Sequence, residues 1–205
     1  MCSNDLVIPK KLSLVGRLVR LEPLAAHHAE DLQRYCSDPA LWEYTFQINP
    51  FGTVTKAHSW VEEAVAAPDE VPFAIIDRST NETIGSTRFL DIQPPHRKME
   101  IGWTFVARHC WRSHVNTECK WLLLQYAFDK AGASRVQFKA EAINQRSRAA
   151  LLRIGATHEG TLRNFRIRPD GEQRDVAFYS IIDRDWPNVR ESLSRKAKAD
   201  VRVPN

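Results

Sequence analysis

Cysteine is scarce in this chain of 205 residues, and so are long apolar runs. The four cysteines, Cys2, Cys36, Cys110 and Cys119, lie far apart with no C-x-x-C pair, which argues against a zinc knuckle and a disulfide framework. No segment approaches the roughly 18 consecutive apolar residues of a membrane span, and the N-terminus lacks the apolar core of a signal peptide. We therefore expect reduced, structural thiols in a soluble cytoplasmic protein that makes no membrane contact.

Repeats, low-complexity linkers and metal-ligand spacing are also missing from the sequence. His27, His28 and His58 lie on separate helix-like segments without ligand spacing, so no metal site is expected. With 43% hydrophobic residues the chain can bury one core. We expect an N-terminal extension over 1–13, one domain over 14–190, and a basic, flexible tail over 191–205.

The net charge of +4 would suit an anionic ligand without identifying one. Much of this excess lies in the last dozen residues, which have little apolar material to pack. A solvated end is the simpler interpretation of that segment, and a nucleic-acid contact is the weaker one.

Hydrophobic periodicity predicts alternating strands and helices along the chain. The expected order is a strand at 18–24, helices at 25–38 and 55–67, three strands between 72 and 107, a helix after 115, a strand at 135–142, a helix at 144–156, and two strands around the turn at 169–173. This order predicts a mixed α/β fold with a mostly antiparallel central sheet and flanking helices. The aromatic segment 39–55 could be core filler or the wall of an acceptor site.

A cluster of cations and polar residues stands before the amphipathic helix that follows Val115. The first backbone N–H groups of that helix and the positive end of its dipole could hold a phosphate. Arg112 and Lys120 could add charge, and Ser113, Asn116 and Thr117 could add short donors. Taken alone the pattern is weak, because most strand-to-helix turns with an arginine bind nothing.

Several linked motifs around this cluster support its interpretation as a phosphate site. They are EIGW, then R-x-x-V-N-T-E-x-K-x-L-L-L, then N-x-R-S-R-A-A-x-x-R-I-G-A-x-x-E-G-x-x-R, and finally a Pro-Asp-Gly turn with R-D-x-x-x-Y-S-I-I. Over roughly Leu14 to Trp186 this order resembles the RimJ/RimL-type branch of the GNAT superfamily of N-acetyltransferases. The resemblance implies transfer of an acetyl group from acetyl-CoA to a primary amine by direct attack in a ternary complex, with CoA as product. The acceptor would be a protein N-terminus or a small molecule, and the oligomeric state stays open, a homodimer included.

The resemblance also assigns the cofactor site. The loop residues Arg112, Ser113, His114, Val115, Asn116 and Thr117 would wrap the CoA pyrophosphate, the backbone of Phe105 and Val106 would pair with the pantetheine arm, and Asn144 would lie near that arm or the adenosine phosphate. The family loop usually has two glycines, where this chain has His114 and Asn116. Side chains at these positions could narrow the loop, or the loop could demand φ values that His and Asn bear less easily. His114 could be a phosphate donor, an acceptor-side group or a simple loop residue.

Two catalytic residues are implied in the same way. Glu100 matches the family's frequent base, acting through water, although a salt-bridged structural carboxylate is the alternative. Leu151 stands where many members have the tyrosine that protonates the leaving thiolate of CoA. Ser147 is therefore the candidate for that role. Ser147 could equally be a capping serine, and Tyr179 is an outside candidate. Simple alternation places Glu100 and Thr104 on one strand face.

The competing hypothesis is a non-catalytic module that keeps the GNAT fold and binds nucleic acid or a partner protein. The missing glycines and the missing tyrosine favour it a little. The presence of Glu100, Ser147 and Asn144 together favours the enzyme more, so nucleic acid is not expected as the main partner.

Overall fold

The fold is that of a computed structural model in which residues 6–198 are described. One sheet of eight strands runs through it in the order β1-β2-β3-β4-β5-β6-β8-β7. The strands are β1 Leu14–Val15, β2 Val19–Pro23, β3 Val71–Asp77, β4 Thr83–Gln93, β5 Lys98–Val106, β6 Arg135–Glu141, β7 Thr157–Ile167 and β8 Gln173–Ile182. Among the strand pairs within residues 6–198, only β5–β6 is parallel. The predicted mixed, mostly antiparallel sheet is confirmed.

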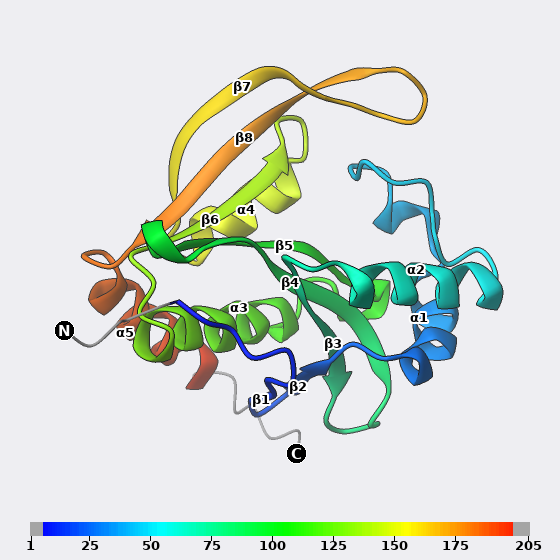
Figure 1. The fold of residues 1–205 in the computed structure, drawn as a ribbon, viewed down its shortest axis with the longest axis horizontal. Helices are drawn as coiled ribbons and strands as arrows, with labels where there is room; N and C mark the ends of the chain where they lie inside the picture. The colour runs from blue at the N-terminus through cyan, green and yellow to red at the C-terminus, as the bar shows by residue number, and fades with distance from the viewer. Residues whose placement is uncertain (1–5, 199–205) are drawn as a thin grey trace.

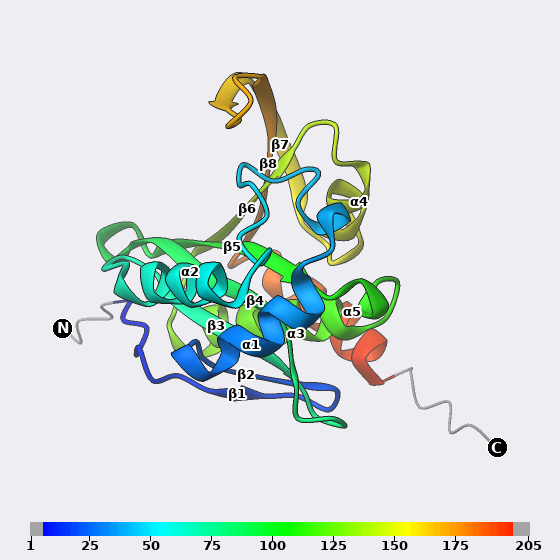
Figure 2. The same cartoon turned by 90° about the vertical axis from the view of Figure 1, so that its right-hand side faces the viewer.

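In the described part of the chain, five α-helices flank the sheet (Figure 1). They are α1 Ala29–Cys36, α2 Val54–Ala66, α3 Val115–Gln125, α4 Gln145–Arg153 and α5 Trp186–Lys198. Helices α1 and α2 pack against each other, α3 packs against α5, and α4 packs on β6. The β7–β8 hairpin extends away from the body of the molecule (Figure 2). Over residues 6–198, no helix has the length and apolar character needed to cross a membrane.

The expected N-terminal extension and the expected C-terminal tail both contribute residues to the core. Leu6 and Ile8, in the expected extension, are buried. The expected tail begins inside α5, whose Leu193 is fully buried, because its helical spacing from Trp186 and Val189 places all three on the inner face. Residues 199–205 lie outside the described part of the chain.

Helix α3 is fastened to the N-terminal strands by one buried carboxylate. Glu118 accepts hydrogen bonds from the backbone N–H groups of Arg17, Leu18 and Val19, at 2.7 to 2.8 Å. A Cβ atom on Gly16 would lie 2.6 Å from the Glu118 carboxyl carbon, so the turn requires glycine there. This contact positions the start of α3, on which the site described below depends.

Candidate functional site

The parallel strands β5 and β6 pair over three residues and then separate. Their register runs only from Lys98↔Arg135 to Glu100↔Gln137, although both strands continue. A cavity of about 820 Å³ opens beyond that point. It is lined by the second half of β5, the loop before α3, α4, and the segment between α1 and α2.

Cations dominate the charge of this cavity. Among residues 6–198, its lining includes six lysine or arginine residues and no aspartate or glutamate: Arg112, Lys120, Lys139, Arg146, Arg153 and Lys196. Such a concave, one-sign surface attracts and holds anionic ligands. Sequence reasoning had selected only Arg112 and Lys120 from this set, because the others come from elements that meet only in the folded chain.

Strand β5 is irregular where it borders the cavity. Gly102 pairs with Arg88 and Phe105 pairs with Ser86, so Trp103 and Thr104 together lie opposite Thr87. Trp103 has φ of 50°, in the left-handed region that bulky residues rarely adopt. This bulge breaks the expected alternation, and the placement of Thr104 on the Glu100 face by simple alternation was wrong.

Close approach of β4 to the bulged strand depends on one glycine. A Cβ atom on Gly85 would lie 2.2 Å from the carbonyl oxygen of Phe105. The Phe105 ring packs against Trp42, Phe51 and Trp60 at 5.1 to 5.6 Å between ring centres. These ring contacts anchor Phe105 in the core, and both Phe105 and Val106 contribute to the lining of the cavity.

The aromatic segment between α1 and α2 has two roles. Trp42 and Phe51 are buried core residues, whereas Tyr44 lines the cavity. Phe46 lies under the guanidinium of Arg166 from β7, which is 4.7 Å from the ring centre. Core filler and cavity wall are thus both present in this segment.

The loop before α3 adopts its sharp turn at an unexpected residue. Arg112 has φ of 60°, whereas His114 has φ of −84° and Asn116 is already helical. Of the two effects considered for the missing glycines, demanding φ values at His114 and Asn116 do not occur, because the residue in the left-handed region is Arg112. Arg112, Ser113 and His114 are exposed, while Val115 points into the core and does not line the cavity.

Polar groups at the start of α3 have unused hydrogen-bonding capacity. The buried Oδ1 atom of Asn116 has no hydrogen-bond partner among the described residues. The N–H groups of Asn116 and Thr117 belong to the first helical turn, which has no intrahelical acceptors for them. Both residues line the cavity, so a ligand there could supply the missing partners.

Helix α4 forms the opposite wall and begins as predicted. The Asn144 side chain accepts a hydrogen bond from the Ser147 N–H at 2.9 Å, and Gly155 ends the helix with φ of 93°. Ser147 and Leu151 both line the cavity. The capping residue is thus Asn144, which leaves the Ser147 side chain on the cavity wall.

Glu100 lies next to the cavity rather than on its surface. Its carboxylate is buried, 2.7 Å from Lys139 Nζ and 3.1 Å from Gln137 Nε2. Lys139 lines the cavity, whereas Glu100 does not. Tyr179, the outside candidate, is buried away from the lining and accepts a hydrogen bond from Arg148 Nε at 3.0 Å.

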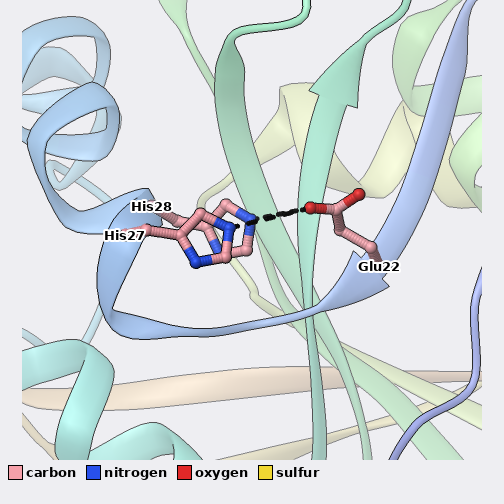
Figure 3. Close-up of side chains that lie close together, drawn as sticks. All are labelled: Glu22, His27 and His28. Carbon is pink, nitrogen blue, oxygen red and sulfur yellow. Dashed lines mark hydrogen bonds and ion pairs between the residues drawn. The ribbon is translucent and has the colours of Figure 1, made fainter.

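Glu22, His27 and His28 form a separate cluster near the start of α1 (Figure 3). Their potential ligand atoms lie close enough together, within 4.8 Å of one another, to hold a metal ion. His28 Nε2 lies 3.0 Å and His27 Nε2 3.9 Å from Glu22 Oε1. The other Glu22 oxygen is bonded to Arg20 Nε at 2.5 Å, and that cation disfavours a metal ion beside it. Sequence spacing had not placed Glu22 with the histidines. The Glu22–His28 contact joins β2 to α1, which is a structural role.

Three of the four cysteines belong to the described residues, and one of them, Cys110, lines the cavity. Cys2 lies outside the described part of the chain. Cys36, Cys110 and Cys119 are buried and free. Burial raises the pKa of Cys110 to about 11 and that of Cys119 to about 12, and raises the pKa of Cys36 further. These thiols are protonated core residues at neutral pH.

Comparison with known proteins identifies the family and the fold. The family model described as an acetyltransferase (GNAT) domain matches residues 18–157. An uncharacterized N-acetyltransferase, p20 from Bacillus licheniformis, is 27% identical over 177 residues, which are 85% of this chain and 98% of that protein. The crystal structure of a GCN5-related N-acetyltransferase from Brucella melitensis is 29% identical, with a TM-score of 0.87 over 92% of this chain and 86% of that one.

A further solved structure shares the fold at lower identity. Mycobacterium smegmatis RimJ in complex with CoA-disulfide is 20% identical, with a TM-score of 0.78 over 94% of this chain and 98% of that one. The match of the family model covers more than half of the residues, and the eight-stranded sheet agrees with the solved relatives. The chain therefore belongs to the GNAT family and is an acetyltransferase.

Proposed function

We propose that this protein transfers the acetyl group of acetyl-CoA to a primary amine, either a protein N-terminus or a small amine. GNAT acetyltransferases use acetyl-CoA and act on amine acceptors. The observation that carries the proposal is the cavity where β5 and β6 separate, with six cations and no carboxylate in its described lining. The phosphates of CoA are the anionic groups that such a lining would attract.

The residues present fit this cofactor. Residues Arg112 to Thr117 would hold the pyrophosphate at the N-terminus of α3. The unpartnered Oδ1 of Asn116 would accept a hydrogen bond from an N–H or O–H group of the cofactor. The backbone of Phe105 and Val106 would accompany the pantetheine arm, and Asn144 on α4 would face it across the cavity.

Acetyl-CoA supplies an activated acetyl group when it is bound. Glu100 would take a proton from the acceptor amine through water, since its carboxylate lies just outside the cavity surface and is bonded to Lys139. Ser147 would donate a hydrogen bond or a proton to the leaving sulfur from the cavity wall. The acceptor would enter past Leu41, Tyr44 and Thr45, which line the cavity from the segment between α1 and α2.

Calorimetric titration with acetyl-CoA, followed by thiol release with a panel of N-terminal peptides and small amines, tests this proposal. We expect one-to-one binding and release that depends on an amine. Glu100→Gln and Ser147→Ala should each lower turnover, by about a hundredfold for a lost acid or base, with little change in acetyl-CoA affinity. The matched controls are Glu63→Gln and Ser59→Ala, which are exposed on α2.

Two results would contradict the assignments. Unchanged turnover in Glu100→Gln or Ser147→Ala would remove that residue's role. Failure of the wild-type protein to bind acetyl-CoA, especially together with tight binding of nucleic acid, would favour the non-catalytic alternative.

A further inference from the structure

Lys120 of α3 lies at the floor of the gap between β5 and β6. The last paired residues of the two strands are Glu100 and Gln137. Just beyond them, Lys120 Nζ lies 2.6 Å from Thr104 Oγ1 of β5 and 5.8 Å from the centre of the Phe138 ring of β6. Lys120 is only 5% exposed, yet it lines the cavity. Its ammonium group is therefore shielded from bulk water and faces the space that opens between the strands.

This buried ammonium group has no carboxylate of its own. Its hydrogen-bond partner Thr104 is neutral and also lies 2.8 Å from Thr87 Oγ1. The titratable groups that act on Lys120 are Cys119 on its own helix and Glu100 on β5, and the Glu100 carboxylate is already paired with Lys139 of β6. Burial lowers the pKa of Lys120 to about 8, and the nearby Glu100 carboxylate compensates for this effect only in part, because Cys119 is an uncharged thiol near that pH.

A buried cation that is only partly compensated is costly for a fold, and such groups cluster at functional sites. The cost would be offset if a negative charge formed beside the cation during the reaction. The group that becomes negative in acyl transfer from a thioester is the leaving sulfur. Neither Thr104 nor Ser147 carries a charge that could stabilise a thiolate.

We propose that Lys120 stabilises the thiolate of CoA at the base of the strand gap and returns a proton to it. This inference rests on the proposed function. As the C–S bond of the thioester breaks, its electron pair goes to sulfur, one N–H bond of the ammonium group breaks, and an S–H bond forms. The neutral amine of Lys120 then regains a proton from water. Ser147 is left as a hydrogen-bond donor to the sulfur.

The test measures the thiol pKa of bound CoA from the near-ultraviolet absorbance of the thiolate, with no acceptor and no turnover. A cation close to the sulfur lowers a thiol pKa by about one unit or more. We therefore expect Lys120→Met to reduce the thiolate fraction of bound CoA at least about tenfold at neutral pH. Lys56→Met, on the exposed surface of α2, is the matched control and should leave that fraction unchanged.

Two further variants separate charge from structure. Lys120→Gln can still donate a hydrogen bond to Thr104 but carries no charge, so it should behave like Lys120→Met. Lys120→Arg keeps the charge and should retain most of the thiolate. Because these two variants can be compared directly, the test holds even if Lys120→Met fails to fold.

The outcomes for this inference and for the proposed function are distinguishable. No CoA binding by the wild-type protein would overturn the proposed function. Normal binding with the same thiol titration in Lys120→Gln as in the wild type would overturn the inference alone. Recovery of the thiolate in Lys120→Gln, with no further gain in Lys120→Arg, would mean that the hydrogen bond to Thr104 matters and the charge does not.

Discussion

The guanidinium of Arg146 lies over the indole ring of Trp111, 3.6 Å from the ring centre. Trp111 in turn donates its Nε1–H to the carbonyl oxygen of Val106 at 3.1 Å. One side chain of α4 is thus joined, through the loop before α3, to the end of β5. Both Trp111 and Arg146 line the cationic cavity.

Removing this contact should weaken binding of the cofactor. In Arg146→Met we expect acetyl-CoA affinity to fall about tenfold, because a lost cation–π contact and a lost phosphate partner together amount to about 1 to 2 kcal/mol. Calorimetric titration measures the change. Arg34→Met is the control: Arg34 lies 5.7 Å from the Tyr35 ring on α1 and does not line the cavity. Equal affinity in Arg146→Met and the wild type would contradict this role.

Glu118 should matter for stability rather than for chemistry. In Glu118→Gln, an amide N–H₂ group replaces one of the two carboxylate oxygens that accept hydrogen bonds from three backbone N–H groups. At least one buried backbone N–H therefore loses its acceptor. We expect the free energy of unfolding to drop by about 2 to 3 kcal/mol in urea denaturation. Glu62→Gln, which is exposed on α2, should change it little. A Glu118→Gln variant as stable as the wild type would show that the turn does not depend on this carboxylate.

Replacing Lys120 should stabilise the protein while it impairs the reaction. Its pKa in the folded chain falls from 10.5 to about 8, so below pH 8 the folded state carries the cost of a buried ammonium group. That cost fades as the pH rises from 8 to 10.5. Lys120→Met should therefore raise the free energy of unfolding by up to about 3 kcal/mol at neutral pH, and by much less near pH 10.5. Denaturant titrations at both pH values check the sign, and a less stable variant at neutral pH would indicate a structural role.

Lowering the pH should reduce the stability that Glu159 contributes to the folded protein. Hydrogen bonds from Arg135, opposed by burial and assisted by Ser180, lower the pKa of Glu159 from 4.5 to about 2. A folded-state pKa below the unfolded value contributes stability above pH 4.5, and this contribution is lost as the pH falls toward 2. Glu159→Gln should thus flatten the acid limb of the stability curve between those values. An identical acid limb in the variant would show that another carboxylate sets it.

Local sequence signals predicted most of the elements. The alternation of strands and helices and the Pro-Asp-Gly turn of the last hairpin are short-range features that depend on neighbours in the chain. The two-residue strand β1 and the whole of helix α5 were missed. Both depend on contacts with distant residues, such as Glu118 for the turn that follows β1.

The site was harder to predict than the fold. Residues on one loop or one helix, such as Arg112 and Ser147, could be found from sequence pattern and resemblance. Arg146 and Lys139 could not, because they reach the cavity only after α4 and β6 have packed. Likewise the bulge at Trp103 reflects a register change against β4, which alternation along one strand cannot reveal.

The crystal structure of the protein with CoA tests the central claim most directly. The account predicts the pantetheine arm between Thr104 of β5 and Phe138 of β6, the sulfur beside Lys120 Nζ, and the pyrophosphate at Arg112 to Thr117. CoA bound elsewhere on the molecule would contradict this prediction. A gap filled by side chains in the CoA complex of an active protein would contradict it as well.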